Sequence, residues 1–391
     1  MASATENPHR LDLQSIIEAG SAATGLSDMG EPDIVPGLQV LIDSYINDAH
    51  LHAQGVENQR QALIGLVANR LRIADALKRN PEIREQQIRG PIIITGLARS
   101  GTTKLQRMMA SDPQLRWLPL WRLLHPMPLG SIPPGAEDPR IALTEQVSAA
   151  MREHFPDFYA GHPMNATEPD EEVMMADLAL RSSYNSHALR IPAFDTWMKQ
   201  QDHGVWYRFL HTMLQIFQWQ GVAGKIWLLK APSHLAYLQP LFAVFPQATI
   251  VHCHRDPVAT TASMAKLVYA ARRMSSNFDD HDELGQFIVG WWSWKMQRYM
   301  QQRPLLETRN RFVDVAYREI TGNTMAAIER IYEAAGIELS ADARRAMLDW
   351  EVANPPGKHG KHSYSLEDFG VHAAQTRAAF ADYLARFGDL V

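Results

Sequence analysis

The chain has 391 residues and a formal charge of −5, with 46% hydrophobic and 21% charged residues. This length supports a large hydrophobic core, and the composition is that of a globular protein rather than a disordered or fibrous one. The negative balance excludes a general electrostatic attraction to nucleic acid or to an anionic membrane surface, so we expect no nucleic-acid partner. Any bound anion must be held by a local group of cations.

A single cysteine, Cys253, excludes an intrachain disulfide and a cysteine-rich zinc module. The first ten residues lack the apolar segment of a signal peptide, and no stretch approaches the 18 or more apolar residues of a spanning helix. We therefore expect a cytoplasmic protein without membrane insertion.

Residues 1–88 form the first unit along the chain. Apolar residues recur at helical spacing, as at Leu38, Leu41, Ile42 and Tyr45, and predict a helical N-terminal extension that ends near Asn80. Such helices pack against a larger core or contribute directly to substrate binding, and we favour packing. Residues 89–391 form the main domain.

Four short apolar runs in this domain have the character of buried parallel strands, at residues 91–95, 226–229, 249–253 and 312–315. Helical patterns follow them at residues 102–110, 233–244, 258–273 and 319–335. This alternation predicts an α/β fold with a P-loop-like parallel sheet flanked by helices. A large helical insertion, residues 113–222 approximately, separates the first two strands and is a natural place for a substrate pocket.

The turn after the first strand reads GLARSGTT, from Gly96 to Thr103. Its glycine spacing is that of a Walker A loop, but Thr102 occupies the position of the lysine that contacts ATP phosphates. ATP hydrolysis is therefore poorly supported. The backbone N–H groups, the hydroxyls of Ser100, Thr102 and Thr103, and the positive end of the next helix still suit a phosphate, together with Gly101. Arg99 adds a charge there, unless it is a surface arginine.

A second anion site is predicted after the third strand, where residues 252–257 read HCHRDP. Arg255 stands at the strand end, and Ser263 lies eight residues later on the next helix. A guanidinium and a hydroxyl in these places can converge on one phosphate. Arg-Asp-Pro alone is also typical of a capped helix start. Only the combination of this motif with the loop from Gly96 to Thr103 is specific.

These motifs resemble those of the sulfotransferase superfamily, whose 5′-phosphosulfate loop reads Pro-Lys/Arg-Ser-Gly-Thr-Thr and whose 3′-phosphate site pairs an arginine with a serine. Ala98 replaces the proline here, and Arg99 looks like the arginine of bacterial members. The resemblance implies transfer of a sulfuryl group from 3′-phosphoadenosine-5′-phosphosulfate (PAPS) to a hydroxyl of a small-molecule acceptor, giving adenosine 3′,5′-bisphosphate, without a metal. Rival interpretations are a nucleotide kinase or NTPase-like protein and a non-catalytic nucleotide-binding module.

The resemblance also implies two further nucleotide contacts. Tyr317 stands where the family places an adenine-contacting tyrosine, and packing on the next helix is the alternative. A late loop containing Lys358, Gly360 and Lys361 looks like the loop that closes over the 3′-phosphate. Solvated loop charge is the alternative for those two lysines.

Acceptor chemistry needs a cation near the transferring group and a base for the hydroxyl proton. Lys230 ends the second strand, and its family counterpart is a lysine that steadies the transferring group; a simple ion pair with a carboxylate is the alternative. His234 is our first choice as base, slightly ahead of Glu171 and Glu172. The sequence leaves the acceptor open between a phenol, a steroid or lipid alcohol, a sugar and a polyketide hydroxyl.

A histidine pair and a group of tryptophans are weaker indications of a functional site. His252 and His254 lie on one face of a strand, but no third and fourth ligand with suitable spacing appears in the sequence, so we expect no metal site. Trp291, Trp292 and Trp294 fall on a long helix, where most would pack in the core and one face could line an apolar acceptor pocket.

Overall fold

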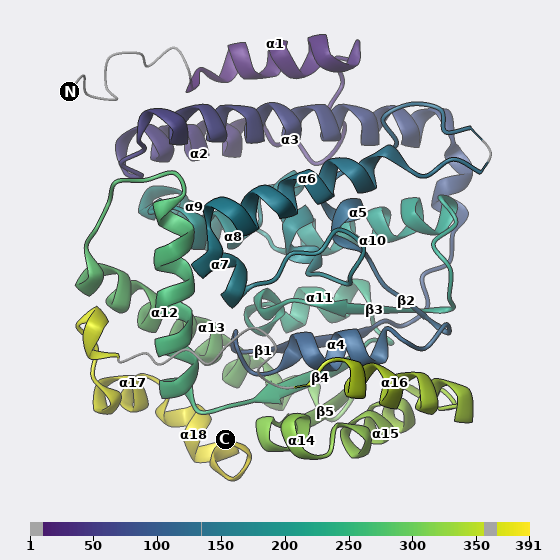
Figure 1. Cartoon of the computed structure of the whole chain (residues 1–391), viewed down its shortest axis with the longest axis vertical. Helices are drawn as coiled ribbons and strands as arrows, with labels where there is room; N and C mark the ends of the chain where they lie inside the picture. The colour runs from purple at the N-terminus through teal and green to yellow at the C-terminus, as the bar shows by residue number, and fades with distance from the viewer. Residues whose placement is uncertain (1–10, 134, 356–365) are drawn as a thin grey trace.

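A parallel five-stranded sheet lies at the centre of the lower half of the molecule (Figure 1). The computed structural model describes residues 11–133, 135–355 and 366–391. The strand order is β2-β3-β1-β4-β5, with these bounds: β1 Ile92–Gly96, β2 Leu115–Arg116, β3 Ile226–Lys230, β4 Thr249–His254 and β5 Arg311–Ala316. The sheet confirms the predicted α/β fold.

β1 is the middle strand and is buried along its whole length. Ile92 pairs with Leu228 of β3 on one side and with Thr249 of β4 on the other. A run of β-branched residues suits this position because both faces of the strand are covered. The loop that follows β1 is therefore anchored from both sides.

Side chains alternate between the two faces of the sheet. Ile92 and Ile94 pack with helices on one face, namely α4 (Thr102–Met109), α15 (Thr324–Ala335) and α16 (Ala341–Ala353). Ile93 and Ile250 belong to the larger core on the other face, which includes α10 (Gly204–Trp219), α11 (Leu238–Val244) and α13 (His281–Leu306). Helices on both faces keep water from the parallel strands.

The edge strand β2 was not predicted. Leu115 pairs with Ile226 and Arg116 with Trp227 of β3, so the segment interpreted as a helical insertion begins with a strand. A two-residue strand shows no periodicity, and Pro113 beside it favoured a loop. The rest of the insertion is largely helical: α5 (Leu120–Leu124), α6 (Pro139–His154), α7 (Pro156–Gly161), the 3₁₀ helix η4 (Glu172–Ala179), α8 (Tyr184–Ala188), α9 (Pro192–Lys199) and α10.

Two predicted helices are divided in the structure. The segment after β3 forms the 3₁₀ helix η5 (Pro232–Ala236) and then α11, with Tyr237 between them in a non-helical conformation. The segment after β5 forms α14 (Tyr317–Gly322) and α15, separated by Asn323, whose side chain caps α15. At Asn323 a side-chain capping hydrogen bond interrupts an apolar pattern that otherwise reads as continuous, whereas at Tyr237 the backbone conformation alone divides the two helices.

The N-terminal helices α1 (Leu13–Thr24), α2 (Val35–Asn47) and α3 (Ala53–Arg79) form the upper layer in Figure 1. Their buried side chains belong to the same hydrophobic cluster as those of α10 and α13. α1 and α3 approach closely at Gly20, where a Cβ atom would lie 2.6 Å from Val67 Cγ1. These helices therefore share one continuous core with the rest of the protein.

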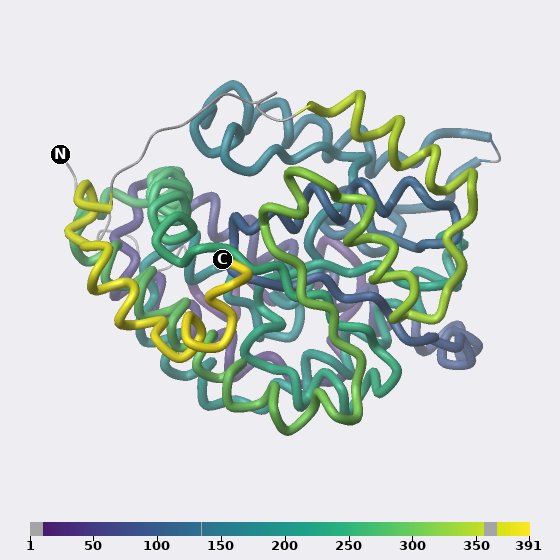
Figure 2. Tube along the Cα trace, turned by 90° about the horizontal axis from the view of Figure 1, so that it is seen from below, coloured from purple at the N-terminus to yellow at the C-terminus, as the bar shows by residue number. Residues whose placement is uncertain are grey.

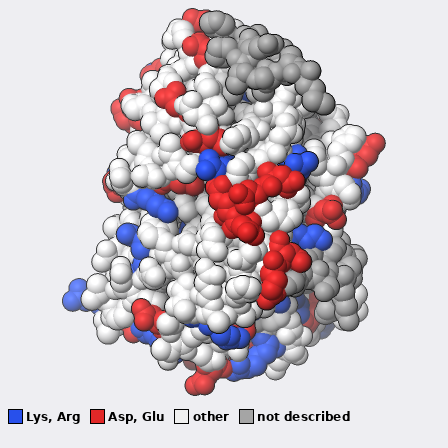
Figure 3. All heavy atoms as spheres, turned by 90° about the vertical axis from the view of Figure 1, so that its left-hand side faces the viewer, with Lys and Arg blue, Asp and Glu red and all other residues white. Residues whose placement is uncertain are grey.

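The C-terminal helices α17 (Ala373–Ala379) and α18 (Ala381–Phe387) contact α12 (Pro257–Arg273) and α13, as the view from below shows (Figure 2). Basic and acidic side chains are interspersed on the face drawn in Figure 3, which shows no extended basic surface. Among the described residues, no helix combines the length and apolar character needed to cross a bilayer.

Candidate active site

A cavity of about 280 Å³ opens where the carboxyl ends of the strands meet the insertion helices. Open parallel sheets bind ligands at this edge. The loop after β1 forms one end of the cavity, with Arg255 and Tyr317. Helices α7, α8, α12 and α13 form the other end, through residues such as Phe158, His187, Leu267 and Trp292.

The loop between β1 and α4 requires both of its glycines. A Cβ atom on Gly96 would lie 2.5 Å from the carbonyl oxygen of Cys253, and Gly101 has a φ of 87°, which favours glycine. Arg99 also has a positive φ, 71°. A non-glycine residue in this region costs roughly 1–2 kcal/mol, a cost typical of functional loops.

The end of this loop presents unused hydrogen-bonding groups. α4 begins at Thr102, and no described side chain caps its first turn. The hydroxyl of Ser100 is buried and has no hydrogen-bond partner among the described residues. Thr103 lines the cavity one residue further along. These groups form an environment that a phosphate would satisfy.

Arg99 and Arg255, with Ser263, lie together beside this loop. The Arg99 Nε donates to the Ser263 hydroxyl over 3.1 Å, and its Nη1 donates to the carbonyl of Gly161. Arg255 donates to the carbonyl of Arg99, and its guanidinium lies 3.9 Å from the centre of the Tyr317 ring. Within the described part of the chain, neither guanidinium forms an ion pair with a carboxylate. Two adjacent uncompensated cations create a local site for an anion.

Asp256, which follows Arg255 in the chain, is engaged by other groups. Asp256 caps α12 by accepting from the backbone N–H of Val258, and it pairs with Arg377 of α17 over 2.9 Å.

The sequence placed Tyr317 at a strand end, and in the structure Tyr317 is the first residue of α14. Lys358, Gly360 and Lys361 lie outside the described residues.

Lys230 links the sheet to the insertion. Its Nζ lies 2.7 Å from Glu171 Oε1 and 3.4 Å from the Thr103 hydroxyl, so it bridges this acid and the phosphate loop. Its backbone N–H donates to Glu172 Oε2 over 2.9 Å. Lys230 is nearly fully buried, whereas Glu171 lines the cavity.

His234 lies behind this pair and is not among the residues lining the cavity. One ring nitrogen, Nε2, lies 2.6 Å from Glu172 Oε1, and the other, Nδ1, lies 3.0 Å from the hydroxyl of Tyr207. Burial raises the pKa of Tyr207, so this hydroxyl stays protonated. Because both ring nitrogens are occupied, His234 has no free atom to offer an acceptor in the cavity. Tyr207 comes from α10, and nothing local in the sequence marked it.

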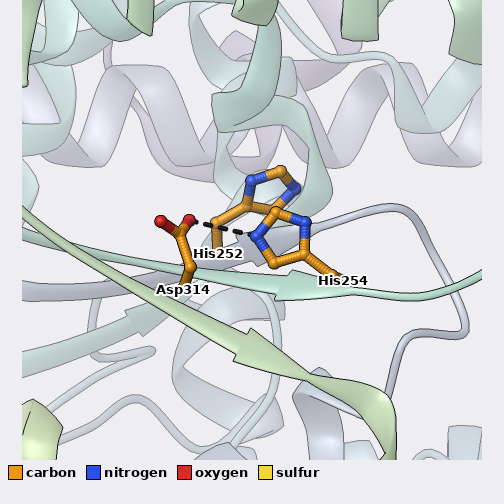
Figure 4. Close-up of side chains that lie close together, drawn as sticks. All are labelled: His252, His254 and Asp314. Atoms are coloured by element: carbon orange, nitrogen blue, oxygen red, sulfur yellow. Dashed lines mark hydrogen bonds and ion pairs between the residues drawn. The ribbon is translucent and has the colours of Figure 1, made fainter. Parts of the chain in front are cut away.

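The structure adds Asp314 as a third candidate metal ligand beside His252 and His254 (Figure 4). β5 brings it beside β4, at a separation that sequence spacing does not show. His254 Nε2 lies 3.0 Å from Asp314 Oδ1, and Arg303 contacts both carboxylate oxygens, at 3.1 and 2.9 Å. Although burial opposes it, hydrogen bonds from His254 and Arg303 lower the pKa of Asp314. This carboxylate is already matched by a cation, which disfavours a metal ion.

The same network reaches the end of the cavity where Arg255 lies. The Tyr383 hydroxyl of α18 lies 3.2 Å from His254 Nδ1 and forms a hydrogen bond with the backbone of Arg255. Since Nδ1 accepts from this hydroxyl, His254 Nε2 carries the proton that it donates to Asp314. Through Tyr383, the cluster of His252, His254 and Asp314 therefore supports the backbone of Arg255, whose guanidinium lines the cavity.

The helical end of the cavity is mainly apolar. Met264, Leu267, Val268 and Ala271 of α12 line it at helical spacing, beginning with the residue after Ser263. The same helix carries Ser263, whose hydroxyl accepts from Arg99 at the other end of the cavity. The remaining apolar wall comes from Phe158, Val173, Met174 and Trp292.

The chain resembles known proteins in sequence and in fold. A model described as "Sulfotransferase family" matches residues 91–341. An omega-hydroxy-beta-dihydromenaquinone-9 sulfotransferase, Stf3, from Mycobacterium bovis is 26% identical over 134 residues, and a protein with the same description from Mycobacterium tuberculosis matches equally. The match covers 34% of this chain and about a third, 34%, of those relatives.

Two solved structures resemble the whole chain. The sulfotransferase STF9 of Mycobacterium avium has a TM-score of 0.85 with 23% identity, covering 96% of both chains. The sulfotransferase STF1 of Mycobacterium tuberculosis H37Rv has a TM-score of 0.77 with 28% identity, covering 95% of this chain and 98% of that one. The first shows the same fold, including the N-terminal helices.

Proposed function

Because this chain belongs to the sulfotransferase family, we propose that it transfers the sulfuryl group of PAPS to a hydroxyl of a small-molecule acceptor. The acceptor oxygen forms a bond to sulfur while the bond between sulfur and the bridging phosphate oxygen breaks. The acceptor proton passes to a base, and the products are a sulfate ester and adenosine 3′,5′-bisphosphate. One observation carries the proposal: the loop after β1 lines the same cavity as Glu171, together with Arg99 and Arg255, neither of which pairs with a carboxylate of the described residues.

In this proposal the nucleotide spans the polar end of the cavity. The 5′-phosphate lies on the loop, against the N–H groups from Gly101 to Thr103 and the hydroxyls of Ser100, Thr102 and Thr103. Arg255 and Ser263 bind the 3′-phosphate, and Tyr317 contacts the adenine. By resemblance, the loop with Lys358, Gly360 and Lys361 closes over the 3′-phosphate.

Glu171 is the base that the geometry favours, ahead of His234. Its carboxylate reaches the cavity, and Lys230 holds it over 2.7 Å. In the transition state, Lys230 and Arg99 stabilise the negative charge that develops on the transferring group and the bridging oxygen. Glu172 and His234 act as positioning residues because they hold the backbone of Lys230 from behind.

The charges required by this reaction come from the chain itself. Sulfuryl transfer requires donors along the bridging oxygen, and Arg99, Lys230 and the first turn of α4 supply them. No step in the proposal passes through a metal ion.

Calorimetry and product analysis test the proposal. We expect adenosine 3′,5′-bisphosphate to bind in the presence of a chelator more tightly than ATP with magnesium. Incubation with ³⁵S-labelled PAPS and a panel of alcohols and phenols should give a labelled product whose mass corresponds to the sulfate ester. Turnover of ATP would instead support an NTPase, and nucleotide binding without any labelled product would support a non-catalytic module.

A further inference from the structure

The helical end of the cavity contains few charges. Of the described residues that line the cavity, Arg99 and Arg255 at the nucleotide end and Glu171 at the junction are charged, and His162 lies 3.6 Å from the buried carboxylate of Asp170. Apart from His162, the wall beyond this junction consists of apolar side chains and a few neutral polar ones. A charged acceptor would lose its hydration there without gaining a partner.

His187 is the polar residue whose state is best defined at this end. Its Nδ1 lies 2.6 Å from the carbonyl oxygen of Ser183. Because a carbonyl only accepts hydrogen bonds, Nδ1 carries a proton. Burial and then the charge of Lys295 lower the pKa of His187 to about 3, so the ring is neutral. Its Nε2 is therefore an acceptor, and it is buried without a hydrogen-bond partner among the described residues.

Trp292 supplies the complementary group. Its Nε1–H is also buried without a partner in the described part of the chain, and its ring centre lies 5.6 Å from that of His187. Both side chains line the cavity. Lys295, whose Nζ lies 4.7 Å from the Trp292 ring centre, donates to the Ser183 hydroxyl, and its ammonium group has no acceptor to offer Trp292 Nε1–H.

We propose that His187 and Trp292 form a neutral subsite that binds a second hydroxyl of the acceptor, distant from the hydroxyl that is sulfated. A hydroxyl both donates and accepts, so it complements an acceptor such as His187 Nε2 and a donor such as Trp292 Nε1. An ether or ketone cannot donate, and a carboxylate presents lone pairs to the lone pair of Nε2. Two buried groups that are costly when unpaired thus become satisfied on binding.

The inference rests on the proposed function and names its substrate class, an uncharged and mainly apolar diol or diphenol. One hydroxyl meets Glu171 and becomes the sulfate ester, and the other stays free in the subsite. The apolar walls from α7 and α12 cover the skeleton between them. A sugar fits poorly because most of its hydroxyls would face side chains that cannot bind them.

The test uses acceptors that differ only in the second hydroxyl. We would measure kcat/KM with labelled PAPS for α,ω-alkanediols from hexanediol to dodecanediol and for the monomethyl ethers of the same diols. At the chain length that fits the cavity, the diol should exceed its ether by roughly tenfold, the effect of one satisfied hydrogen bond. The absence of any preference at every length would overturn the inference.

Three variants assign the preference to the subsite. His187→Phe should abolish it, and His187→Gln, which restores an acceptor, should recover part of it. His211→Phe on α10, outside the residues lining the cavity, is the matched control and should keep it. If His187→Phe does not fold, Trp292→Phe removes only the donor and should reduce the preference; an unchanged preference there would contradict the subsite.

Binding measurements separate this inference from the proposed function. Calorimetry of the same diols and ethers on the complex with adenosine 3′,5′-bisphosphate does not need transfer. Selective diol binding without any sulfated product would refute the proposed function and support the subsite. Transfer to ethers and diols alike would do the reverse.

Discussion

At the residue scale, two adjacent acids have different environments. Glu171 lines the cavity and pairs with Lys230, whereas Glu172 is buried against the backbone of Lys230 and the ring of His234. Neighbouring residues at the start of η4 point in different directions, so one carboxylate can act on a substrate while the other holds the strand end. This difference is the reason why we propose Glu171 as the base rather than Glu172 or His234.

Glu171→Gln should therefore lower kcat by about 10²–10⁴-fold, the usual contribution of a positioned base. Its affinity for adenosine 3′,5′-bisphosphate, measured by calorimetry, should change little. Glu168→Gln, on the same segment but outside the cavity lining, is the control. If His234→Gln proved as damaging as Glu171→Gln while nucleotide affinity held, the histidine would regain the role of base.

Arg255→Ala should weaken the binding of adenosine 3′,5′-bisphosphate by more than about 1.5 kcal/mol, the lower value for a hydrogen bond to a charged group. The affinity for adenosine 5′-phosphate should fall much less, because that ligand lacks the 3′-phosphate. Arg318→Ala, an exposed arginine of α14, provides the comparison in the same titration. Equal losses for the two nucleotides would place the 3′-phosphate elsewhere.

The sequence indicated which residues belong to the candidate site more readily than it indicated the role of each residue. Ser100, Arg255 and Ser263 could be predicted as site residues because motif spacing along one strand and one helix is local information. The enclosure of His234 depends on Tyr207, and the support of Arg255 depends on Tyr383, 128 positions later in the chain. Such contacts arise only when distant segments pack, so no pattern along the chain indicates them.

At the scale of elements, the strands with continuous β-branched or apolar runs were predicted, because burial on both faces imposes that composition. β2 was missed, since pairing with β3 rather than its own residues defines it. The breaks at Tyr237 and Asn323 were missed for a similar reason: the backbone conformation at Tyr237 and a capping hydrogen bond at Asn323 divide those helices while the apolar pattern continues.

α18 has a specific role among these elements because its Tyr383 joins His254 to the backbone of Arg255. Tyr383→Phe should reduce the preference for adenosine 3′,5′-bisphosphate over adenosine 5′-phosphate by a few fold, since Arg255 loses an anchor worth about one hydrogen bond. A purely structural role would lower stability without changing that ratio. Tyr332→Phe, which removes a buried hydrogen bond to Asp112 on the other face of the sheet, is the matched control.

At the scale of the whole molecule, one core joins the N-terminal helices to the insertion and the sheet. Asp177 of η4 is buried within this assembly, and burial raises its pKa from 3.8 to about 7. The folded state therefore favours the protonated carboxyl. The associated stability is complete below the unfolded pKa of 3.8 and is lost as the pH rises through about 7.

Asp177→Asn should accordingly raise the free energy of unfolding at pH 8 by on the order of 2 kcal/mol, because the amide carries no charge to bury. At pH 4 the variant and the parent protein should differ little. Denaturant titrations at the two pH values measure this, with the exposed Asp349→Asn as reference. A stability gain of the same size at both pH values would exclude ionisation as its cause.

α12 carries Ser263 near its first turns and the apolar wall from Met264 to Ala271 beyond it. In the proposed function, this helix sets the distance between the bound sulfuryl donor and the acceptor. Substitutions among the apolar residues of α12 would change which acceptors fit in the cavity and leave the position of the sulfuryl group unchanged. Inserting one residue would instead turn the wall by about 100° away from the cavity. Substitutions in α12 can therefore alter the choice of acceptor, whereas insertions or deletions in it cannot.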